Sequence, residues 1–191
     1  MSLVDLTLSM ANPGQEKLGP DQPYSAKQTM RTREWRIGTG ASAYSARVHY
    51  LDHWSMAGTY LDFPGHIAQT DDGVDAGNAP LPRLYRLDAT VIHLDRGHQP
   101  GRITEGELTA ACPAGASGQA LVVHALGTRR FDEIEYQSLY LGRDAVAWII
   151  GRGTRLLVAD VYESHCDPQD VFRDLFRAGL YAVCHPVNLH R

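Results

Sequence analysis

Short apolar runs, separated by polar stretches that contain Gly and Pro, set the pattern of this chain. Runs of this length and composition, bounded by turn residues, predict β-strands. They cover residues 3–8, 46–51, 89–94, 120–125, 155–160 and 180–184. Residues 10–34 are instead polar and rich in Gly, Pro and Gln, and we expect them to form a long ordered loop.

Helices are predicted where capping residues precede a helical run. Thr104 has Glu107 three residues further on, so the two side chains can form a capping box. A second helix is expected over 143–151. A third fits between Asp167, which can cap its start, and Gly179, which can end it. Strands therefore outnumber helices, and we expect an α/β fold with a mixed, largely antiparallel sheet and flanking helices.

Length and composition indicate one soluble globular domain over residues 1–191, with 43% hydrophobic and 21% charged residues. The net charge of −4 and the lack of a dense Lys/Arg run argue against nucleic acid or an anionic membrane as a partner. A small neutral or polar ligand is expected instead. No apolar run is long enough to span a bilayer and no signal peptide is recognisable, which predicts a cytoplasmic protein. The three cysteines lack a CxxC spacing, so we expect free thiols.

Candidate chemistry gathers in the segment HWSMAGTYLDFPGH, residues 53–66. If the segment is extended, every second side chain projects from one face; that face carries Met56, Gly58, Tyr60, Asp62, Pro64 and His66. Pro64 can turn the chain so that His66 folds back toward Asp62. The carboxylate could then orient the imidazole, or both could bind a cation. Alternatively, Asp62 caps a turn and His66 only bonds to the backbone.

The other histidines in apolar surroundings are assigned structural roles. His93 and His124 lie within predicted strands and are expected to be buried and hydrogen-bonded. His49 and His53 precede the candidate segment and could replace metal ligands, but nothing else near them favours a metal. Trp54 adjoins the segment and is the best candidate for an aromatic pocket wall.

The stretch GTYLDFPGH resembles the His-x-Gly-Thr-His-x-Asp-x-Pro-x-His signature of the cyclase family, which includes bacterial kynurenine formamidase and isatin hydrolase. The matching residues are Gly58, Thr59, Asp62, Pro64 and His66. The likeness covers most of the chain. VDLTLSM is similar to the family's opening, Asp160 and Ser164 to its Asp-x-x-x-Ser element, and Asn188-Leu189 to its ending. The resemblance implies the swivelling β/β/α fold of kynurenine formamidase.

Departures from the signature concern the metal ligands. In the family, the first two histidines and the aspartate bind a divalent metal, and a downstream His and Glu complete the set. The two histidines correspond here to Met56 and Tyr60, and the downstream pair to Phe172 and Cys184; a slip of one residue would put His185 at the last position. We therefore expect no cofactor. The alternative is Zn or Mn at a rebuilt site whose ligands would be Asp62, His66, Cys184 and His185.

The resemblance implies hydrolysis of an amide-type bond in an aryl formamide or lactam-like small molecule. Without the inherited metal, His66 would activate water or shuttle a proton, Asp62 would hold it, and Tyr60 would donate to the oxyanion. The same groups would suit a metal-free cyclisation, dehydration or isomerisation. Substrate contacts are expected from Trp54, Met56 and Ser164. The alternative is a binding protein that keeps the pocket and has lost catalysis. The family also implies a homodimer or homotetramer.

Overall fold

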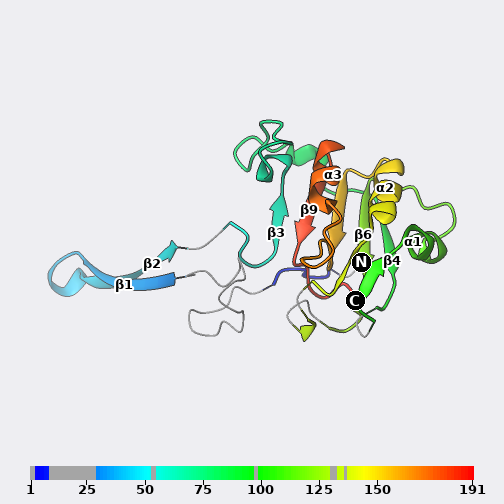
Figure 1. Cartoon of the computed structure of the whole chain (residues 1–191). Helices are drawn as coiled ribbons and strands as arrows, with labels where there is room; N and C mark the ends of the chain where they lie inside the picture. The colour runs from blue at the N-terminus through cyan, green and yellow to red at the C-terminus, as the bar shows by residue number, and fades with distance from the viewer. Residues whose placement is uncertain (1–2, 9–28, 53–54, 97–98, 130–132, 136) are drawn as a thin grey trace. The chain divides into compact units, whose positions relative to one another are not determined.

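The computed structural model describes residues 3–8, 29–52, 55–96, 99–129, 133–135 and 137–191. The chain divides into two compact units, one formed by residues 1–8 together with 61–191 and the other by residues 9–60 (Figure 1). Each is described by itself. The prediction of one domain over 1–191 stays a prediction.

A five-stranded sheet with the order β3-β9-β8-β6-β4 organises the larger unit. Its strands are β3 (Tyr60–Asp62), β9 (Tyr181–Cys184), β8 (Leu156–Ala159), β6 (Ala120–His124) and β4 (Ala89–His93). The pairs β4 with β6, β6 with β8 and β8 with β9 are all parallel. A second, two-stranded parallel sheet joins β5 (Gly101–Ile103) to β7 (Leu139–Leu141).

The α/β class with flanking helices is confirmed, but the largely antiparallel pairing is wrong for this sheet. The burial of the strands gives the physical reason. β6 and β8 are apolar and buried along almost their whole length, as expected for parallel strands covered on both faces. β4 lies at the edge and alternates between buried and exposed residues.

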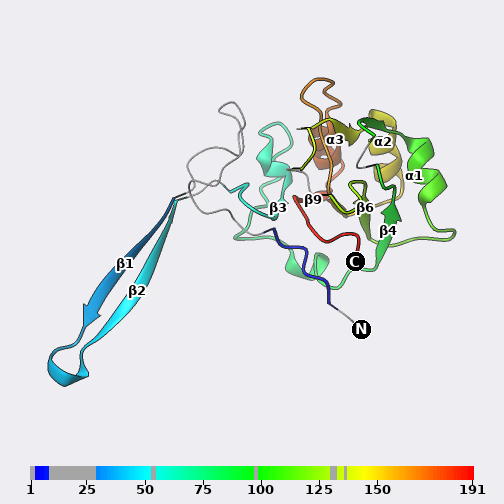
Figure 2. The same cartoon turned by 90° about the horizontal axis from the view of Figure 1, so that it is seen from below.

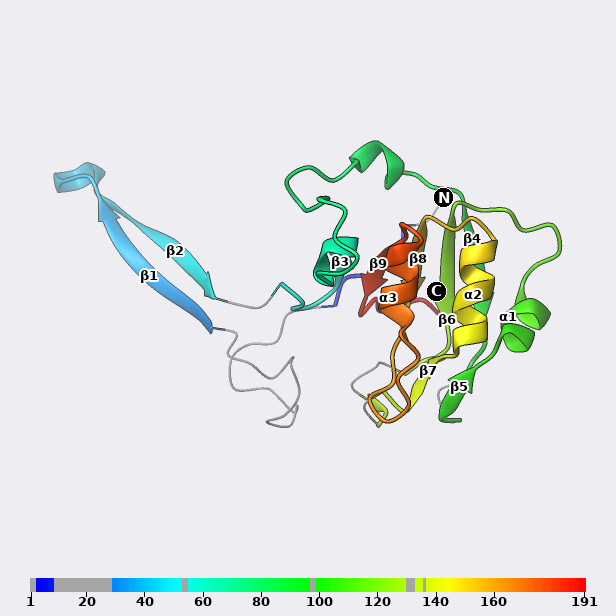
Figure 3. The same ribbon diagram turned by 45° about the horizontal axis from the view of Figure 1, so that its top comes forward.

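The α-helices of the described residues flank the sheet: α1 (Glu105–Ala111), α2 (Arg143–Gly151) and α3 (Val171–Arg177). α2 contacts both α1 and α3, and Figure 3 shows α2 and α3 over the same face of the sheet. The predicted capping box is present, because Thr104 Oγ1 accepts from the Glu107 amide while the Glu107 carboxylate accepts from the Thr104 amide. Side chains with almost no exposure form the core, including Ile92, Leu121, Val123, Ile149, Leu157 and Leu175.

α3 begins later than predicted. Its N-cap is Asp170, with φ of 59° and no capping bond from its own side chain. The carboxylate of Glu163 accepts from the Gln169 and Val171 amides at 2.7 and 2.9 Å instead, and so takes over the role expected of Asp167. The predicted end is confirmed, because Gly179 follows the C-cap with φ of 74°.

Residues 3–8 form no strand, which corrects the prediction for this run. They are tied to the end of the chain instead, since the Asn188 side-chain amide donates to the Asp5 carbonyl at 2.8 Å and the Val187 amide donates to Leu6. Asn188 has φ of 63°, a conformation that Asn tolerates better than most residues. The two ends that carried the family resemblance are therefore joined.

The described part of the smaller unit consists mainly of a β-hairpin (Figure 2). Strands β1 (Thr29–Ile37) and β2 (Tyr44–Asp52) pair antiparallel around a turn that contains η2 (Gly40–Ser42). The prediction of a long loop over residues 10–34 is thus wrong for residues 29–34, which belong to β1. Residues 10–28 lie outside the described residues.

The two faces of the hairpin carry different kinds of side chain. Its register puts alternate residues of both strands on one face. One face carries Arg33, Trp35, Ile37, Tyr44, Ala46, Val48 and Tyr50, and the other carries Thr32, Glu34, Arg36, Ser45, Arg47 and His49. The apolar side chains include large exposed ones, such as Trp35 at 52% and Tyr44 at 60%.

In the described part of the chain, no helix combines the length and the apolar character needed to cross a bilayer.

Candidate functional site

Asp62 and His66 meet in the structure. Asp62 ends β3, Phe63 stays extended, and the single 3₁₀ turn η3 (Pro64–His66) brings the His66 Nδ1 atom to 3.2 Å from the Asp62 Oδ1 atom. Pro64 fits the first position of this turn because its ring fixes φ and it has no amide to satisfy. The predicted return of His66 toward Asp62 is confirmed.

A threonine not identified from the sequence braces this turn. The Thr70 hydroxyl lies 2.7 Å from the Pro64 carbonyl and 3.1 Å from that of Ile67. The Phe63 ring packs edge-on against Tyr181 of β9, with centroids 5.4 Å apart. The turn that carries His66 is thus attached on both sides. Only the spacing of Thr70 from Ile67, typical of a hydroxyl that bonds to backbone three residues earlier, could have indicated it.

The environment of the pair differs at its two ends. Asp62 is only 7% exposed and also accepts from the Phe63 amide at 3.2 Å, whereas the His66 side chain is 41% exposed. The hydrogen bond to Asp62 raises the pKa of His66 above its ordinary value; partial burial opposes this, and the charge of Asp62 adds to it. Since a carboxylate only accepts, Nδ1 carries the proton and Nε2 is left as the basic atom.

The predicted common face of alternate residues 56–66 is only partly formed. The strand covers Tyr60–Asp62, whereas residues 55–59 form turns and bends with Gly58 at φ of 68°. A positive φ interrupts an extended segment, so the alternation that would align Met56 with Asp62 is lost. Met56 and Tyr60 are half-buried and belong to the smaller unit. Trp54 and His53 lie outside the described residues.

The remaining candidate positions are built into the fold of the larger unit. Ser164 is 4% exposed, and its hydroxyl accepts from the Asp167 amide at 3.0 Å. Phe172 stacks on Tyr162, with centroids 5.0 Å apart. Cys184 ends β9 at 2% exposure, and His185 follows with φ of 52°. No disulfide joins Cys112, Cys166 or Cys184, as expected.

Among the described residues, no three His, Cys, Asp or Glu side chains are grouped so that they could hold a metal ion. The rebuilt site of Asp62, His66, Cys184 and His185 is therefore not assembled. The donors that are brought together, one carboxylate and one imidazole, fall short of the three protein ligands of a catalytic zinc. His49 bonds to Thr32 across the hairpin at 3.0 Å, a structural role.

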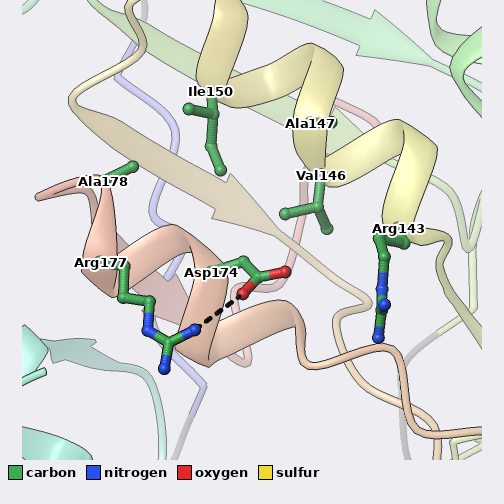
Figure 4. A pocket seen from close by; sticks show the side chains of 7 residues that line it. All are labelled: Arg143, Val146, Ala147, Ile150, Asp174, Arg177 and Ala178. Carbon is green, nitrogen blue, oxygen red and sulfur yellow. Dashed lines mark ion pairs between the residues drawn. The ribbon is translucent and has the colours of Figure 1, made fainter. Parts of the chain in front are cut away.

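A groove of about 350 Å³ lies elsewhere, between α2 and α3 (Figure 4). Arg143, Val146, Ala147 and Ile150 face Asp174, Arg177 and Ala178 across it. Asp174 forms an ion pair with Arg177 at 3.9 Å. The groove includes neither Asp62 nor His66, so the acid-base pair and the groove are separate features.

Comparison with known proteins extends these observations. A family model described as Putative cyclase matches residues 4–164. Isatin hydrolase A from Labrenzia aggregata, solved with benzyl benzoate, is 18% identical with a TM-score of 0.65; the match covers 97% of this chain and 80% of that one. A predicted metal-dependent hydrolase from Bacillus stearothermophilus is 17% identical with a TM-score of 0.64, covering 96% and 81%. At these identities the structures establish a shared fold. A search of curated proteins finds no match.

Proposed function

Because this chain belongs to the cyclase family, we propose that it is a small-molecule hydrolase in which His66 and Asp62 carry the acid-base chemistry. The observation that carries the proposal is the contact of 3.2 Å between a buried carboxylate and a half-exposed imidazole. This arrangement fixes the tautomer and leaves Nε2 accessible to a reacting proton. It supplies a general base from protein groups alone.

The proposed substrate is an aryl formamide or a lactam-type compound such as isatin. His66 Nε2 takes a proton from water as the water oxygen attacks the carbonyl carbon. The carbon–nitrogen bond then breaks, and His66 returns the proton to the leaving nitrogen. Asp62 accepts from Nδ1–H throughout and stabilises the transient imidazolium. Family membership and the fold of the isatin hydrolase neighbour support this choice.

We further propose that the protein is a cytoplasmic homo-oligomer. The hairpin of this chain exposes large apolar side chains, among them Trp35 and Tyr44, on the face that also carries Arg33. Covering this face with a second copy would remove that surface from water.

The experiment measures hydrolysis of an aryl formamide and of isatin by the wild type, His66→Ala and the control His165→Ala, since His165 is exposed and outside the pair. Loss of a general base lowers turnover by about 10²–10⁴-fold, so His66→Ala should be nearly inactive and the control unchanged. Equal turnover by wild type and His66→Ala would contradict the proposal.

Repeating the assay with a chelator and with added Zn²⁺ or Mn²⁺ tests whether a metal takes part. Turnover unaffected by either addition supports chemistry by His66 and Asp62. Turnover that appears only with added metal would instead support a rebuilt site. No turnover on any amide or lactam, with retained binding of the intact compounds, would favour a non-catalytic binding protein.

A further inference from the structure

A second group of titratable side chains lies at the carboxyl ends of the parallel strands. His93 is the last residue of β4, His124 the last of β6, and Asp160 directly follows β8. The register pairs His93 with His124 on neighbouring strands. In α/β folds this edge of the sheet is where ligands bind. β4 and β3 lie at opposite edges of the sheet, so this group is separate from Asp62 and His66.

Hydrogen bonds fix the proton positions on both rings. The His124 Nε2 atom is 2.6 Å from the Gly127 carbonyl, which can only accept, so Nε2 carries a proton. In neutral His124, Nδ1 is therefore an acceptor. The His93 Nδ1 atom lies 2.9 Å from it and must donate. The neutral pair thus leaves the lone pair of His93 on Nε2, and His93 is exposed whereas His124 is 5% exposed. The expectation that both histidines are buried is wrong for His93.

Asp160 completes a chain of three groups. Burial raises the pKa of Asp160, and the amides of Ala125 and Leu126, together with the charge of His124, oppose that rise. The amides donate to both carboxylate oxygens at 2.9–3.1 Å, which suits an ionised carboxylate. Its Oδ2 atom is 4.0 Å from His124 Nε2. A positive charge formed on His124 would therefore be stabilised by Asp160.

We propose that Asp160, His124 and His93 form a proton relay, and that His93 Nε2 is a general-base site for a small molecule with an acidic O–H or N–H. When Nε2 takes a proton, the proton on His93 Nδ1 can pass to Nδ1 of His124. The charge then rests beside Asp160, while the His93 ring is neutral. The relay thus holds the added positive charge inside the protein, while His93 Nε2 keeps the proton that it took and can return it to the ligand.

Two other titratable groups face this relay. His190 lies near His124, with ring centroids 6.4 Å apart, and the Asp95 carboxylate closely approaches Gly127. Both lie close enough to act on the relay through their charge. Variants at His190 therefore serve as controls for electrostatic effects.

Nitrogen-15 NMR of histidine-labelled protein tests the proton positions. At a pH where the rings are neutral, we expect His93 as the Nδ1–H tautomer and His124 as the Nε2–H tautomer. The substitution His124→Gln should release His93 to a mixture of tautomers, whereas His190→Gln should leave its tautomer unchanged. An Nε2–H tautomer of His93 in the wild type would overturn the proposal.

Acylation by diethyl pyrocarbonate tests the basic atom. His93 Nε2 attacks the reagent carbonyl, the carbonate group leaves, and His124 accepts the Nδ1 proton. Peptide mass spectrometry should show His93 modified faster than the exposed control His165. In His124→Phe and His124→Gln the rate at His93 should fall about tenfold, the scale of one hydrogen bond to an ionised group. Folding of each variant is checked by circular dichroism. Unchanged reactivity of His93 in a folded His124 variant would refute the relay.

Discussion

The substitution Glu163→Ala should destabilise the start of α3, because the Glu163 carboxylate accepts from two backbone amides there. The bonds to Gln169 and Val171 are 2.7 and 2.9 Å long. Each hydrogen bond to an ionised group contributes about 1.5–3 kcal/mol. Glu163 is half-buried, so water can replace part of this, and we expect a loss of roughly 2–4 kcal/mol of unfolding free energy. For a chain of this size the melting temperature should fall by roughly 5–15 °C.

Thermal and urea unfolding followed by circular dichroism measure this loss. The matched control is Asp167→Ala, which removes the cap expected from the sequence and an exposed bond from the Tyr140 hydroxyl at 2.7 Å. We expect it to cost less than about 1 kcal/mol. Glu163→Gln keeps an acceptor oxygen and should fall between the two. A larger loss for Asp167→Ala than for Glu163→Ala would refute the assignment of Glu163 as the anchor of α3.

Three further predictions concern catalysis, assembly and the core. The bond to Asp62 raises the pKa of His66, so the fraction of neutral His66, and with it kcat/KM, should increase as the pH rises through that pKa. In Asp62→Asn, the increase in kcat/KM should occur at lower pH. The double substitution Trp35→Ser with Tyr44→Ser should reduce the mass measured by light scattering if their exposed face joins copies of the chain. Leu157→Ala, at 0% exposure, should cost about 2–5 kcal/mol in urea unfolding.

Local signals in the sequence predicted local structure well. The capping box of Thr104 and Glu107 involves residues three apart, so the residues that decide the helix start are adjacent in the chain. The turn at Pro64 that joins His66 to Asp62 is likewise local. The start of α3 could not be predicted in this way. The carboxylate that fixes it belongs to Glu163, eight residues before Val171, whereas capping patterns relate residues about three positions apart.

Pairing between distant segments could not be read from the sequence. An apolar run such as β6 predicts a buried strand but not its partners. Its parallel neighbours β4 and β8 are distant in the sequence, because parallel strands are joined by long crossover connections. The hairpin was missed in part because the alternation over 29–37 contains four charged residues, which favoured a polar loop. Strands of three residues, such as β5, carry too little pattern to detect.

Two of the four positions that the resemblance aligns with metal ligands, Phe172 and Cys184, make packing contacts in the larger unit. Phe172 stacks on Tyr162 and contacts Phe176, and the Tyr162 hydroxyl in turn bonds to backbone carbonyls of β8 and β9. Placing a histidine at 172 would therefore disturb packing that supports the central sheet. Cys184 is also enclosed at the end of β9. Asp62 and His66 lie on a strand end and a braced turn, so the acid-base role proposed for them requires neither Phe172 nor Cys184.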